Sequence, residues 1–166
     1  LAQEKLMKSY YLSYGIPVVL TRSFTYINPR RPDIFSSAFA KQVVEIEKGK
    51  RKKLVYGNLD SVRSIIDVRD IVEAYWISVN KCDYGEEYNI GVKNPITVGE
   101  FLKVLLSYAK VNIPCEQDTN LLRPVDVTLQ VPDVSKFENK KGWKPKYTLN
   151  ESIRSEEHTS ELQSRE

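Results

Sequence analysis

The sequence predicts an α/β fold, and three observations support this prediction. Residues 16–22, Ile-Pro-Val-Val-Leu-Thr-Arg, form a nearly continuous apolar run, as expected of a strand buried on both faces of a parallel sheet. Apolar residues at helical spacing occupy 1–14 before this strand and the stretch from about Ser36 to Lys48 after it. Strand-like and helix-like segments continue to alternate further on, which is typical of α/β proteins.

Local signals mark the limits of most elements. Two prolines in 28–32 exclude a regular helix there. Thr97 and Glu100 match a capping box, in which each side chain bonds an amide of the first helical turn. The predicted elements, in order, are helix 1–14, strand 16–22, loop 28–32, a helix capped by Ser36 or Ser37 and ending near Lys48, strand 54–57, helix 67–80, strand 87–91, a helix after Thr97, the mostly irregular stretch 113–133, and a short helix before Gly142.

Composition and charge limit the class of protein. The chain has 166 residues, of which 41% are apolar, enough to bury the core of one compact domain. No apolar run approaches the roughly 20 residues needed to span a bilayer, so no membrane partner is expected. The basic run 48–53 contains no aromatic residue that could stack on bases, which favours a solvated turn over a nucleic-acid site.

The two cysteines, Cys82 and Cys115, point to a cytoplasmic protein. Two residues 33 positions apart form neither a disulfide framework nor a metal motif, so buried or half-buried thiols are expected and no metal is predicted.

The two ends of the sequence predict a fragment. No initiator Met and no signal peptide stand at Leu1, which suggests that the chain is part of something longer. Residues 154–166 lack apolar periodicity and resemble the translation of a sequencing adapter, so they are expected to be an artefact tail. This tail holds the only histidine, His158.

Taken alone, the residues point to a binding site more than to catalytic machinery. No glycine-rich dinucleotide loop is present, and without a genuine histidine the Ser–His–Asp and Cys–His types of catalysis are not expected. Three arginine-containing stretches, 28–31, 57–63 and 122–127, are predicted loops near strand ends, where α/β proteins bind ligands. Arginine forks suit diphosphates, although an arginine in a surface ion pair would leave the same pattern.

Six stretches, in this order and spacing, resemble successive landmarks of one family. They are 14–24, 57–63, 67–72, 88–91, 122–127 and 142–145. The family comprises the GDP-mannose 4,6-dehydratases and the closely related GDP-4-keto-6-deoxymannose reductases, which are extended short-chain dehydrogenases/reductases, and the resemblance covers residues 1 to about 153. The loop 28–31 is more similar to the dehydratases, and 67–70 and 122–126 are more similar to the reductases.

The resemblance implies the C-terminal part of a Rossmann-type doubly wound sheet plus a small substrate-binding α/β subdomain. Residues 1–35 would end the NAD(P)-binding domain, and residues 36–153 would bind the sugar nucleotide. The Tyr-x-x-x-Lys motif and the glycine-rich loop of the family would precede Leu1, so no catalytic residue is expected in this chain and the fragment is expected to be inactive alone. A homo-oligomer is expected at full length.

The resemblance also implies site residues. Arg63 and Arg123 would hold the diphosphate and nucleoside of a GDP-sugar, with Asp126 near the ribose, and they would fix the sugar for hydride transfer at its C4. Gly57, Asn58 and Thr25 would line the same pocket, although the family has Asn at the position of Thr25.

Two residues would face the cofactor, NADP or NAD. They are Tyr26, which stands where the family has His, and Arg31.

Three alternatives remain open. The first is an epimerase or dehydratase of UDP- or dTDP-sugars with the same fold. The second is an α/β binding module with no chemistry, and the third is a nucleic-acid binder that uses 48–53. We also expect the isolated fragment to be poorly stable, because strand 16–22 would leave an apolar sheet face exposed.

Overall fold

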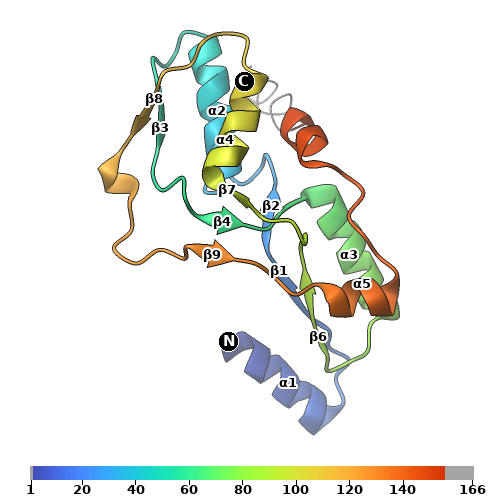
Figure 1. Cartoon of the computed structure of the whole chain (residues 1–166). Helices are drawn as coiled ribbons and strands as arrows, with labels where there is room; N and C mark the ends of the chain where they lie inside the picture. The colour runs from blue at the N-terminus through green and yellow to red at the C-terminus, as the bar shows by residue number, and fades with distance from the viewer. Residues whose placement is uncertain (1, 156–166) are drawn as a thin grey trace.

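The computed structural model describes residues 2–155, in which helices and strands alternate (Figure 1). Two pairs of helices flank the strands. Helices α2 (Phe35–Glu47) and α4 (Val98–Ser107) lie together at one end, and α3 (Val68–Lys81) and α5 (Ser135–Lys141) lie beside the strands at the other. This mixture of helices with mainly parallel strand pairs confirms the predicted α/β class.

Two parallel strand pairs lead into the centre of the molecule. Strand β1 (Leu20–Ser23) pairs with β6 (Glu87–Ile90), and β2 (Thr25–Ile27) pairs with β5 (Ile65–Asp67). The predicted start of the first strand at residue 16 was wrong. Residues 16–19 lie opposite the turn that precedes β6, so the regular ladder begins only where the Leu20 amide donates to the Glu86 carbonyl, at 3.0 Å.

Shorter strands complete the framework. Strand β4 (Val62–Arg63) lies between antiparallel β7 (Ile96–Thr97) and parallel β9 (Leu129–Gln130). Strand β3 (Leu54–Tyr56) pairs in parallel with β8 (Cys115–Gln117), which leads into the 3₁₀ turn η1 (Thr119–Leu121). Residues distant in sequence are therefore joined around β4 (Figure 1).

The helix starts show which local signals determine structure. The capping box is confirmed: the Glu100 amide donates to Thr97 Oγ1 at 3.0 Å, and the Thr97 amide donates to Glu100 Oε2 at 2.7 Å. The predicted serine cap of α2 was wrong, because Ile34 is the N-cap residue. The Ser37 hydroxyl donates instead to the Asn28 carbonyl, at 2.7 Å, and so fastens the helix to the preceding loop.

Two hydrophobic clusters form the core. One joins α2, α4 and β3 and includes Phe39, Val43 and Phe101. The other joins α3, α5 and β6, where Phe137 stacks edge-on against Trp143 at a centroid distance of 5.2 Å. Each cluster draws on both sides of the predicted boundary between residues 35 and 36, and that division stays a prediction.

Two helices expose apolar residues that the sequence pattern places on buried faces. Helix α1 (Ala2–Tyr14) has no buried residue. On α3 the apolar side chains of Val72, Trp76 and Val79 are 61%, 71% and 73% exposed. The side that packs inward presents Ile71, Ala74 and Ser78 instead, so α3 has two apolar sides and only one is covered.

A buried carboxylate attaches the C-terminal segment to α3. Asp70 is fully buried and accepts hydrogen bonds from the backbone amides of Lys146, at 3.0 Å, and Tyr147, at 3.2 Å. Beyond this contact, residues 149–155 are helical. The rest of the predicted artefact tail, 156–166 with His158, lies outside the described residues.

Candidate functional site

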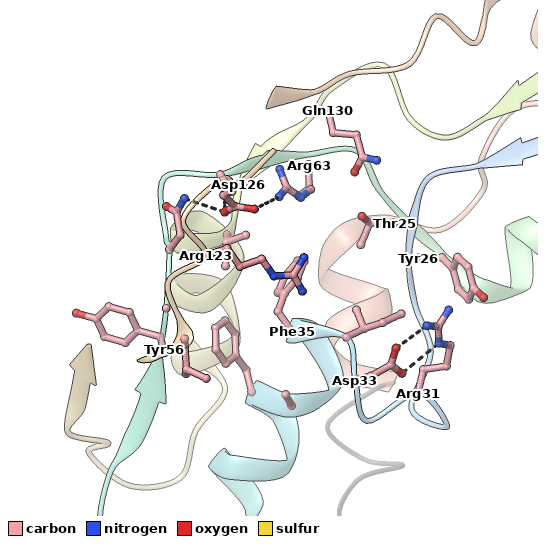
Figure 2. Close-up of a pocket in the computed structure, with 18 of the residues that line it drawn as sticks. Thr25, Tyr26, Arg31, Asp33, Phe35, Tyr56, Arg63, Arg123, Asp126 and Gln130 are labelled. Carbon is pink, nitrogen blue, oxygen red and sulfur yellow. Dashed lines mark hydrogen bonds and ion pairs between the residues drawn. The ribbon is translucent and has the colours of Figure 1, made fainter. Parts of the chain in front are cut away.

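An open cavity of about 560 Å³ lies where several of these elements end (Figure 2). Its walls come from the ends of β1 and β2, the first turns of α2, the loop after β3 and the segment 121–130. The volume is in the range of small-molecule sites, about 300–1,000 Å³, and loops after parallel strands are where α/β proteins bind ligands. This cavity is therefore the candidate site.

The structure brings all the site residues predicted from the sequence to this one cavity. They come from three separate stretches of chain, 25–31, 57–63 and 123–126, and their roles stay predictions. The lining includes Thr25, Tyr26, Arg31, Gly57, Asn58, Arg63, Arg123 and Asp126.

Asp126 is the centre of a hydrogen-bond network. Its Oδ2 atom accepts from Asn58 Nδ2 and from Ser61 Oγ, each at 3.0 Å, and its Oδ1 atom lies 3.7 Å from Arg63 Nη2. The hydrogen bonds from Ser61 and Asn58, together with the charge of Arg63, lower the pKa of Asp126 below its usual value. The carboxylate therefore stays ionised and joins two walls of the cavity.

The two central arginines differ in their surroundings. Arg63 is mostly buried, lies beside Asp126 and donates to the Val62 carbonyl at 3.0 Å. Arg123 is exposed, and among residues 2–155 it has neither a hydrogen bond nor an ion pair. Its side chain extends into the cavity (Figure 2). An anion entering the cavity thus meets one oriented guanidinium and one whose N–H groups are all available.

The third arginine already has an anionic partner. Arg31 Nε and Nη2 donate to the two carboxylate oxygens of Asp33, at 3.3 and 2.6 Å, and this bond lowers the pKa of Asp33. Asp33 and, to a lesser extent, the nearby side chain of Tyr26 raise the pKa of Arg31. The guanidinium is therefore balanced in charge, and it shares the cavity lining with Tyr26 of β2.

Gly57 has a structural reason to be glycine. A Cβ atom there would lie 3.0 Å from both the Cβ and the carbonyl oxygen of Leu121. The absence of a side chain thus allows η1 and the segment after it to approach the loop after β3. In this way Gly57 lets the segment that contains Arg123 close one side of the cavity.

Several lining residues were missed from the sequence. An aromatic wall is formed by Phe35, Phe39 and Tyr56, and Phe35 packs edge-on against Phe39 at a centroid distance of 6.0 Å. The spacing of Phe35 and Phe39, four residues apart on a predicted helix, would have indicated a shared face. Ser61 and Asp33 gave no signal, because serine and aspartate are common in loops.

The described residues offer neither a metal site nor a membrane-spanning helix. Within 2–155, no group of three or more His, Cys, Asp or Glu side chains is arranged to hold a metal ion. In the same range, no helix has both the length and the apolar character needed to cross a bilayer. Both cysteines are free thiols, Cys82 buried and Cys115 exposed.

A comparison of the sequence with models of known families identifies the family of this chain. The model described as GDP-mannose 4,6 dehydratase matches residues 1–156. The chain belongs to this family.

The chain is similar to a reductase in sequence and to the RMD structure in fold. GDP-6-deoxy-D-mannose reductase of Pseudomonas aeruginosa is 27% identical over 156 residues, which cover 93% of this chain and 51% of that protein. The structure of RMD from Pseudomonas aeruginosa complexed with NADPH superposes with a TM-score of 0.90 at 24% identity, over 98% of this chain and 54% of the other. The chain thus spans about half the length of each of these two proteins.

A solved epimerase shares the same architecture. UDP-glucose 4-epimerase of Thermus thermophilus, in complex with NAD, superposes with a TM-score of 0.80 at 26% identity, over 96% of this chain and 51% of the epimerase. These similarities support the predicted Rossmann-type, short-chain dehydrogenase architecture.

Proposed function

We propose that this chain is the sugar-nucleotide-binding part of an NAD(P)-dependent enzyme of the GDP-mannose 4,6-dehydratase or GDP-4-keto-6-deoxymannose reductase type. The observation that carries the proposal is the convergence of Arg63 and Arg123 on one cavity, with Arg123 free of any partner among the described residues. Two guanidinium forks on one cavity suit a diphosphate, because each can bond two oxygens and neither loses its charge.

The nucleoside would lie between Asp126 and the aromatic wall. Oδ2 of Asp126 already accepts two hydrogen bonds, whereas Oδ1 faces Arg63 at 3.7 Å and keeps acceptor capacity for a ribose hydroxyl. The rings of Phe35, Phe39 and Tyr56 offer an apolar surface for a base. Asn58, Gly57 and Thr25 would complete the walls beside the sugar.

The residues at the end of β2 fit a cofactor ring. Tyr26 contributes a planar side chain to the cavity lining, and Arg31, in the same lining, has five N–H groups of which two are directed to Asp33. The Thermus thermophilus epimerase structure, which contains NAD, supports a nicotinamide cofactor here. NAD(P), when bound, would supply hydride exchange at C4 of the sugar.

The contribution proposed for residues 2–155 is binding and orientation. Arg63, Arg123 and Asp126 would hold the nucleotide, so that the attached sugar points toward Thr25 and Tyr26. Positioning of this kind accelerates a reaction because it holds the reacting atoms at near-contact distance. We assign no proton transfer to a residue in this range.

The competing function is an epimerase or dehydratase of UDP- or dTDP-sugars, favoured by the likeness to the UDP-glucose 4-epimerase. Calorimetric titration of the chain with GDP, UDP and dTDP tests the two. We expect the tightest binding with GDP. Preference for UDP or dTDP would favour the competing function, and no binding of any of the three would overturn the proposed site.

A further inference from the structure

The segment that carries Arg123 has few attachments to the rest of the molecule. Between residues 122 and 127, Asp126 provides the side-chain hydrogen bonds that reach another part of the described chain. Its neighbour Val125 is 89% exposed. Regular pairing resumes only at β9, where the Val62 amide donates to the Thr128 carbonyl at 2.8 Å. The position of Arg123 therefore depends on what holds Asp126.

Ser61 is the most buried of the groups that hold Asp126. It is 2% exposed, and its Oγ donates to Asp126 Oδ2 at 3.0 Å across 65 residues of sequence. Asn58 Nδ2 donates to the same oxygen at 3.0 Å. Two donors saturate Oδ2 and turn Oδ1 toward Arg63 and the cavity. The hydroxyl of Ser61 thus determines which carboxylate oxygen is left for a ligand.

We propose that Ser61 is a positioning residue for nucleotide binding, which acts through Asp126 to place Arg63 and Arg123 and to direct Oδ1 into the cavity. This inference rests on the proposed function. It adds a residue whose hydroxyl is directed to Asp126, and a coupling between two loops that would otherwise bind the nucleotide independently.

The ionisation of Asp126 gives the proposal a specific signature. The charged group that faces this carboxylate is Arg63, while Asn58, Ser61 and the Val127 amide are neutral donors, and Arg123 lies in the same cavity. Ser61 is foremost among the groups that lower the pKa of Asp126. Without its hydroxyl this pKa rises. Binding that requires the carboxylate is then lost at a higher pH as the solution is acidified.

The test compares Ser61→Ala with Ser78→Ala in the full chain, with GDP as the probe. Ser78 is a matched control because it is also 2% exposed, and its hydroxyl donates to the Ala74 carbonyl in α3, away from the cavity. At neutral pH we expect Ser61→Ala to bind GDP at least about tenfold more weakly, which corresponds to the lower end of the contribution of one hydrogen bond to a charged group. We expect the acid limb of its binding profile to shift to higher pH, and Ser78→Ala to match the unsubstituted chain in both respects.

A ligand-free measurement separates this inference from the proposed function. Carbon NMR of the Asp126 carboxyl should show a higher pKa in Ser61→Ala than in Ser78→Ala. Equal GDP affinities and equal pH profiles in the two variants, or equal pKa values, would overturn the positioning role while leaving the proposed function intact. Failure of the unsubstituted chain to bind GDP would overturn the proposed function and, with it, the role in binding.

Discussion

Replacement of Arg123 by alanine tests the diphosphate site most directly. Because Arg123 has no hydrogen bond or ion pair within the described residues, its replacement removes no polar interaction among them. A bidentate, charge-assisted pair to a phosphate in an open cavity contributes about 2–3 kcal/mol, which corresponds to about 30-fold to 150-fold in the dissociation constant. We expect calorimetry to show this loss of GDP affinity.

Two companion variants show where the loss originates. Arg123→Lys keeps the charge but loses the planar fork, so an intermediate loss of about tenfold is expected. Arg30→Ala removes an exposed arginine that does not line the cavity and should leave GDP affinity unchanged. All three variants should unfold at the temperature of the unsubstituted chain. A GDP affinity of Arg123→Ala within about twofold of the unsubstituted chain would refute the assignment, because a lost phosphate contact costs at least about tenfold.

Other predictions concern stability. Asp70→Asn should lower the free energy of unfolding by about 2–3 kcal/mol in urea titrations, since it turns an NH₂ group toward the amides of Lys146 or Tyr147; an unchanged midpoint would show that this contact is dispensable. Gly57→Ala should cost about 1–3 kcal/mol and weaken GDP binding, because its Cβ meets Leu121 at 3.0 Å; full GDP affinity would argue against the close approach. The chain alone should bind the dye ANS strongly and unfold at a low temperature, given the apolar faces of α1 and α3, and a cooperative transition with a high midpoint would contradict this expectation.

Elements fixed by their own residues were predictable from sequence. The capping box at Thr97 and Glu100 involves amides within three positions, so no distant partner is needed to form it. Helix α5 ends where Gly142 adopts a positive φ of 65°, a conformation that glycine enters without strain. The start of α3 was equally local, because Asp67 caps it by accepting from the Arg69 amide at 2.8 Å.

Elements fixed by distant partners were less predictable. Strands β4 and β9 contain two residues each and have no periodicity, and they exist because they pair across more than 60 positions. The first strand starts later than its apolar run, since the position of the turn before β6 decides where pairing begins. The apolar pattern of α3 indicated a helix but could not show which of its two apolar sides would face inward.

The residues of the candidate site were also predictable only in part. Arginine-containing loops near strand ends, together with the family resemblance, predicted the residues that converge on the cavity. Their partners were not predictable, because no local signal relates Ser61 to Asp126 or shows that Arg31 is balanced by Asp33. Which guanidinium is available to a ligand is a property of the folded chain.

The central position of β4 affects the stage of folding at which the proposed nucleotide site forms. Its partners β7 and β9 come from chain segments about 34 and 67 residues later, and the longer loop, which leads to β9, must close before Arg63 and Asp126 meet. Contacts of such high sequence separation generally form late in folding. Nucleotide would therefore recognise only chains that have completed this step, and at about 100 times its dissociation constant it would shift the folding equilibrium by about 2.7 kcal/mol toward them. Protection of the β4 and β9 amides against hydrogen exchange should consequently rise with added nucleotide.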